Sequence, residues 1–68
     1  MAIIVRLDVA MAKRKMKLQD LSERVGISMT NLSLLKNGHV KGVKFETLDR
    51  LCAVLECQPG DILERDEE

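Results

Sequence analysis

Two short helical patterns joined by a three-residue turn most limit how this 68-residue chain can fold. The first pattern stops at Gly26, which suits the left-handed conformation that often ends a helix. The second begins after Ser28, a good N-cap residue, and stops at the C-cap signal of residues 37–38. The two helices must cross at a steep angle, which requires a short turn with Gly26, and their close approach requires a small residue, which Ser22 supplies.

Apolar spacing extends this pattern to five helices along the chain. We expect them near residues 7–15, 18–25, 29–36, 46–55 and 59–63. Residues 3–5 are β-branched and consecutive, which favours a short extended segment before the first helix. The only aromatic residue is Phe45, so the core must be aliphatic. The sequence therefore predicts a single all-α domain over residues 1–68, with its core in about 7–63 and no sheet of three or more strands.

Cysteine and histidine content argues against a metal site. Cys52 and Cys57 lie five residues apart in an apolar run, and His39 is the only histidine. A zinc site needs about four ligands, which these residues cannot supply. We expect both thiols to be free and buried, and we expect no metal and no cofactor. The apolar run at the start is too short for a signal peptide or a membrane span, so we expect a cytoplasmic protein without a membrane partner.

The sequence does not indicate an enzyme. It contains no Ser/His/Asp set, no second histidine and no glycine-rich phosphate loop after a strand. A chain this short also leaves little room for a substrate pocket. We therefore expect neither catalysis nor a small-molecule substrate.

Charge is strongly polarised along the chain although the net charge is zero. Residues 1–44 carry nine basic and three acidic side chains, a balance of +6. Residues 45–68 carry two basic and eight acidic side chains, a balance of −6. This distribution gives one face that would attract a polyanion and one that would repel it. The alternative is two solvated faces that differ in charge without a ligand.

The helix near residues 29–36 is the best candidate for contacting such a polyanion. A helix projected by a short turn fits the major groove of DNA, which is about 12 Å wide. Met29, Thr30 and Ser33 fall on the outer face of its first two turns. Thr30 and Ser33 could form hydrogen bonds with base edges, and Met29 could contact a thymine methyl group. Asn31 could contribute, or it could lean along the DNA backbone instead.

The stretch LSERVGISMTNLSLLKNG, residues 21–38, resembles the helix-turn-helix of the phage Cro/CI repressor family, also called the XRE family. The resemblance extends over about residues 7–63 and follows the five-helix order of the lambda-repressor-like fold. Its most specific parts are residues 26–38 and the TLxxLxxxL spacing of residues 47–55. It implies a transcriptional regulator that binds double-stranded DNA in a sequence-specific manner. Among regulators, it favours a repressor.

The resemblance also implies roles for particular residues. Base readout would fall to Met29, Thr30 and Ser33. Phosphate contacts would come from the start of the second helix, the cap of the third and the loop after it, with Asn31 as a further candidate. Those positions are Lys17, Leu18, Ser28, Asn37, Lys41 and Lys44. The family often has Thr-Gln where this chain has Lys17-Leu18, so Lys17 would replace the phosphate-binding Gln as a point charge.

Partners follow from the same reasoning. One helix in one half-site gives little specificity, so we expect a homodimer on DNA. The turn at residues 56–60 is where the family often dimerises, and the apolar residues 3–5 are a second candidate. That segment could pair with residues 63–65 of its own chain or across a two-fold axis; we favour the former, because domain termini often lie close together. The alternative function is an antitoxin-like protein-interaction module on the same fold.

Overall fold

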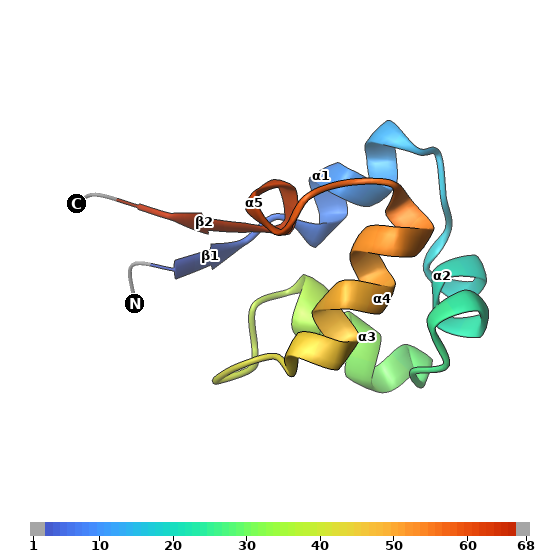
Figure 1. The fold of residues 1–68 in the computed structure, drawn as a ribbon. Helices are drawn as coiled ribbons and strands as arrows, with labels where there is room; N and C mark the ends of the chain where they lie inside the picture. The colour runs from blue at the N-terminus through green and yellow to red at the C-terminus, as the bar shows by residue number, and fades with distance from the viewer. Residues whose placement is uncertain (1–2, 67–68) are drawn as a thin grey trace.

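The computed structural model describes residues 3–66 and confirms the five-helix, all-α class, with one small sheet added (Figure 1). The elements are β1 (Ile3–Val5), α1 (Leu7–Lys13), α2 (Leu18–Val25), α3 (Met29–Lys36), α4 (Phe45–Leu55), α5 (Pro59–Ile62) and β2 (Leu63–Arg65). The predicted helices at residues 18–25 and 29–36 match the structure at both ends.

Three predicted helix ends were wrong by one or two residues. The first helix ends at Lys13 rather than residue 15, because Arg14 leaves the helical conformation and Lys15 takes a positive φ of 52°. The fourth begins at Phe45, one residue early. The fifth ends at Ile62, because Leu63 is already extended and enters β2.

Local capping explains why α2 and α3 end where the sequence predicts. Gly26 closes α2 with a φ of 73°, a conformation that costs residues with a Cβ atom more than glycine. The Ser28 hydroxyl accepts a hydrogen bond of 3.2 Å from the Asn31 backbone amide and caps α3. At the other end of α3, Gly38 has a φ of 75°, and the amides of Gly38 and His39 donate back to carbonyls of the last turn.

The core is aliphatic, as predicted. Its members are Leu7, Ala10, Met11, Leu21, Val25, Leu32, Leu35, Leu48, Leu51, Leu55 and Ile62. They come from all five helices: α2 packs against both α3 and α4, and α1 packs against α5 (Figure 1). Phe45, the only aromatic residue of the chain, lies outside this core with an exposed fraction of 86%.

The extended N-terminal segment pairs within its own chain, which confirms the arrangement that we favoured. β1 and β2 are antiparallel, with Val5 opposite Leu63 and Ile3 opposite Arg65. The side chains of Arg6 and Glu64 add an ion pair, 2.7 Å from Nε to Oε2, beside the sheet. The two strands therefore extend side by side from the helical body (Figure 1).

Both cysteines are free, but the prediction that they are buried was wrong, since each is only half-buried. Cys52 lies at the edge of the buried face of α4, and Cys57 follows the end of that helix. Burial, with Cys57 close by, raises the pKa of the Cys52 thiol. Within residues 3–66, no cluster of three or more His, Cys, Asp or Glu side chains is placed to hold a metal ion. No helix in the same range is long and apolar enough to cross a membrane.

Candidate nucleic-acid interface

The turn between α2 and α3 is held by a side-chain hydrogen bond as well as by Gly26. The Ser22 hydroxyl donates to the backbone carbonyl of Ile27. The Ile27 side chain is half-buried and packs against the core, to which α3 contributes the fully buried Leu32. Only the small size of Ser22 was used in predicting this turn from the sequence. The Ser22 hydroxyl also links α2 to the turn that positions α3.

The N-terminal end of α3 carries a partial positive charge that suits a phosphate group. The first amides of a helix have no carbonyl partner within the helix. Ser28 satisfies only the amide of Asn31 here. Aligned peptide dipoles add a positive potential at this end, so an anion there is stabilised. The exposed Ser28 and Asn31 side chains lie beside it.

Two of the three side chains predicted to contact bases are exposed to solvent. Met29 is 46% exposed, and Thr30 beside it is also exposed. Ser33 is half-buried, and its hydroxyl accepts a long hydrogen bond of 3.5 Å from Asn37 Nδ2. Ser33 is therefore less available to a ligand than the sequence predicts.

Leu34 is a surface residue of α3 that sequence reasoning missed. Its exposed fraction is 42%, although leucine is usually buried. It lies four residues after Thr30, and residues at that spacing share one face of a helix. That spacing was the available signal. The exposed side chains of α3 thus include Met29, Thr30 and Leu34, one hydroxyl and two apolar groups.

The predicted phosphate-binding lysines come from three separate segments. Lys17 is the N-cap residue of α2, Lys41 lies in the loop after α3, and Lys44 is the N-cap residue of α4. All three are exposed, as is Asn37 at the end of α3. Leu18 differs from them, because its half-buried side chain packs against the core and leaves only its backbone amide for an anion.

None of the ion pairs in the described residues includes Lys17, Lys41 or Lys44. Over residues 3–66, the ion pairs join Arg6 to Glu64, Arg14 to Glu56 and Arg50 to Glu46. The first two link the basic half of the chain to its acidic half. The positive charges of the three lysines therefore remain available to a ligand.

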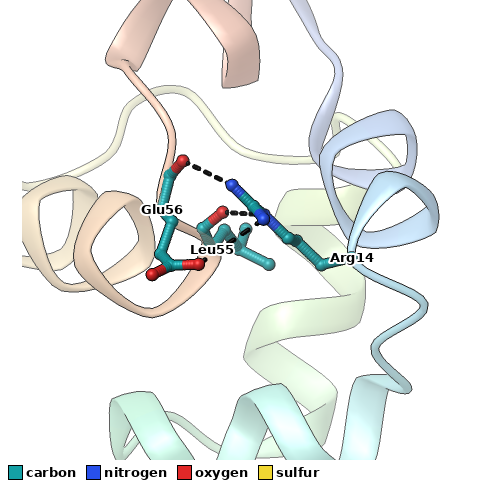
Figure 2. Close-up of polar contacts among 3 residues, drawn as sticks. All are labelled: Arg14, Leu55 and Glu56. Carbon is teal, nitrogen blue, oxygen red and sulfur yellow. Dashed lines mark hydrogen bonds and ion pairs between the residues drawn. The ribbon is translucent and has the colours of Figure 1, made fainter.

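Arg14 has a structural role that no local pattern indicates. Its Nε donates to the Leu55 carbonyl at 2.8 Å, and its Nη2 donates to the Glu56 carbonyl at 2.9 Å (Figure 2). Its Nη1 lies 3.4 Å from Glu56 Oε2. The guanidinium thus caps the C-terminal end of α4, where a positive charge is favourable. Arg14 is therefore assigned to the fold and not to the anion-binding side.

Comparisons with known proteins agree with this geometry. A family model described as the Cro/C1-type HTH DNA-binding domain matches residues 6–68. A curated relative, the uncharacterized HTH-type transcriptional regulator YozG of Bacillus subtilis (strain 168), is 62% identical over 64 residues, which make up 94% of this chain and 76% of the relative. These matches favour the helix-turn-helix interpretation over a module dedicated to protein interaction.

Proposed function

Because this chain belongs to the family of Cro/C1-type helix-turn-helix DNA-binding domains, we propose that it represses transcription by inserting α3 into the major groove of a specific operator. DNA binding and transcription regulation follow from the family. Repression, the residues that read the operator and the number of subunits are the parts that we infer.

The exposed face of α3 is the observation that carries the proposal. The Thr30 hydroxyl can donate to or accept from a base edge. Met29 and Leu34 flank it with apolar groups, which suit the methyl group of thymine. The Ser33 hydroxyl accepts from Asn37 Nδ2 and keeps its own O–H as a donor for a base edge, but the side chain is half-buried. We therefore expect an operator in which each half-site contains a thymine.

We assign the contacts with DNA phosphates to Lys17, Lys41 and Lys44, together with the backbone amides at the capped start of α3. These groups border α3 on three segments and are exposed. Phosphate contacts of this kind hold the protein in register and carry no sequence information. Because each neutralised phosphate releases counterions, affinity should fall steeply as the salt concentration rises.

The active form proposed here is a homodimer on double-stranded DNA. Two recognition helices about 34 Å apart would read half-sites spaced by roughly ten base pairs. The proposed activity is binding alone, with no catalytic step, cofactor or small-molecule substrate. Since bacterial DNA lies in the cytoplasm, the protein would act there.

The test begins by selecting the bound sequence from random duplexes at a fixed salt concentration. Lys41→Ala and Lys44→Ala should then weaken binding to all duplexes about equally and reduce the salt slope by roughly one unit each. Thr30→Ala should instead relax preference at one base pair, at a cost of roughly 1–3 kcal/mol. Lys13→Ala, an exposed lysine at the end of α1 in a hollow shared with Glu56 and Asp61, is the matched control and should change neither property.

The proposal fails if selection yields no preferred sequence. It also fails if the lysine variants change base preference while Thr30→Ala does not, because α3 would then not be the reading element.

A further inference from the structure

Cys52 and Cys57 are brought together by the way in which α4 ends. In a continuous helix, residues five apart point about 140° away from each other around the axis. Here Glu56 takes a left-handed conformation, with a φ of 51°, and turns the chain back. The Cys57 backbone amide then donates to the Cys52 carbonyl at 3.0 Å. This hydrogen bond is that of the Schellman motif, in which the two flanking side chains are often in contact.

The spacing of the two backbones fits a disulfide bond. The covalent bonds that lead from each Cα atom to the carbonyl and the amide, together with the 3.0 Å hydrogen bond, limit the Cα–Cα separation to about 7 Å. Disulfides usually join Cα atoms about 4.4–6.8 Å apart. Both thiols are half-buried and line one groove beside α4, of about 570 Å³. A small oxidant can therefore reach both sulfur atoms, and little backbone movement is needed to join them.

We propose that Cys52 and Cys57 form a modification site for a hydroperoxide, at which oxidation closes a reversible intrachain disulfide. The structure shows the reduced form of this site, with both thiols free. The groove receives no residue from α3, so the site is separate from the DNA-reading face proposed above. Disulfides in cytoplasmic proteins are mostly transient or redox-sensing, which is consistent with a pair of this kind.

The two thiols take different parts in the reaction. Burial, with Cys57 close by, raises the pKa of the Cys52 thiol, so less of it is present as the reactive thiolate. We therefore assign the first attack to Cys57. Its thiolate sulfur bonds to the hydroxyl oxygen of the peroxide, the O–O bond breaks, and the other oxygen leaves with the proton that the thiol released. The product is a sulfenic acid on Cys57.

The second step closes the disulfide. The Cys52 sulfur attacks the sulfenic sulfur, gives up its proton and displaces the hydroxyl group as water. The peroxide gains two electrons in all, and the two thiols lose the same two. A thiol reductant reverses the change by thiol–disulfide exchange.

Proximity decides the fate of the sulfenic acid. Without a neighbouring thiol, further peroxide converts it to a sulfinic acid, which simple thiols do not reduce. A thiol held nearby in the same chain has an effective concentration of about 1 mM or more. At a protein concentration of about 10 µM, it reacts about 100-fold faster than a thiol of another chain. The intrachain disulfide is therefore the expected product.

Hydrogen peroxide added to the reduced full chain tests the site. Intact-mass spectrometry should show the loss of two hydrogen atoms, and maleimide should then label neither of the two cysteines. Dithiothreitol should restore both thiols. At a fixed peroxide concentration, the rate should not depend on the protein concentration, because the disulfide forms within one chain. Cys52→Ser should stop at a sulfenic acid on Cys57, which dimedone captures.

The matched control keeps two thiols in each chain but separates them, by combining Cys57→Ser with Val9→Cys. Val9 is 42% exposed on α1 and does not line the groove that holds Cys52. Circular dichroism should show equal helix content for all variants. We expect the control to form an intrachain disulfide about 100-fold more slowly and to accumulate sulfinic acid and interchain disulfides instead. The proposal is overturned if the unsubstituted protein gives the same products as this control, or if its disulfide joins two chains.

Discussion

Arg14 is the side chain that joins α1 to the end of α4, and Arg14→Ala should lower the free energy of unfolding by about 2 kcal/mol. The guanidinium donates to two backbone carbonyls, at Leu55 and Glu56, that the helix itself leaves without partners (Figure 2). Alanine would leave both carbonyls to water and remove the positive charge from the negative end of the helix dipole.

The magnitude follows from the exposure of these groups. A hydrogen bond with a charged donor contributes about 1.5–3 kcal/mol, and the lower value applies because 46% of the Arg14 side chain is exposed. The charge at the helix end contributes about 0.3–1 kcal/mol more. The ion pair with Glu56 contributes little, because that carboxylate is 74% exposed and solvent screens the pair. In a domain of this size, such a loss lowers Tm by roughly 8–16 °C.

Urea unfolding followed by circular dichroism measures this change. Glu56→Gln is the matched control, since it removes the ion pair and leaves the backbone carbonyl that accepts from Arg14. We expect the control to lose less than about 0.5 kcal/mol. If Arg14→Ala and Glu56→Gln lose equal amounts, the carbonyl bonds contribute nothing and the capping argument is wrong.

Three other substitutions test local features of the structure. Gly26→Ala should cost about 1 kcal/mol in thermal unfolding, because no atom lies within 4 Å of the added Cβ and the φ of +73° alone is strained; Gly60→Ala, at ordinary φ, should cost nothing comparable. The folded state raises the pKa of the Cys52 thiol, so the protonated thiol stabilises the folded protein fully below the ordinary thiol pKa of 9.0. That stabilisation is lost as the pH rises above this value. The free energy of unfolding of Cys52→Ala should therefore fall less steeply at high pH than that of the unsubstituted protein. Leu34→Ala should reduce preference for thymine in the selected operator without changing the salt slope, and an unchanged preference would remove Leu34 from the reading surface.

Much of the candidate site was predictable because its signals are local. A serine cap precedes α3 and glycines end α2 and α3, so the sequence places the recognition helix at the correct residues. The three lysines are exposed because they lie at helix starts and in a loop. The orientation of Ser33 and the exposure of Leu34 were missed, since both depend on how α3 is rotated against the core.

Backbone conformation was predictable only where residue type reports it. Gly26 signals a left-handed helix end, and the structure agrees. Lys15 and Glu56 adopt the same left-handed conformation, with φ values of 52° and 51°. Lysine and glutamate do not favour this conformation, so the sequence does not predict it. In both places local backbone bonds to the preceding helix accompany the turn, from Met16 to the Met11 carbonyl and from Cys57 to the Cys52 carbonyl, and no glycine marks the end of α1.

The sequence by itself determined the number of helices, the aliphatic core and the recognition helix, because apolar period and capping act over a few residues. Tertiary structure alone decided that Arg14 holds a helix end 41 residues away and that Phe45 lies outside the core. Each of these depends on which segments meet after folding. That outcome reflects the packing of the whole chain and leaves no trace in the residues on either side.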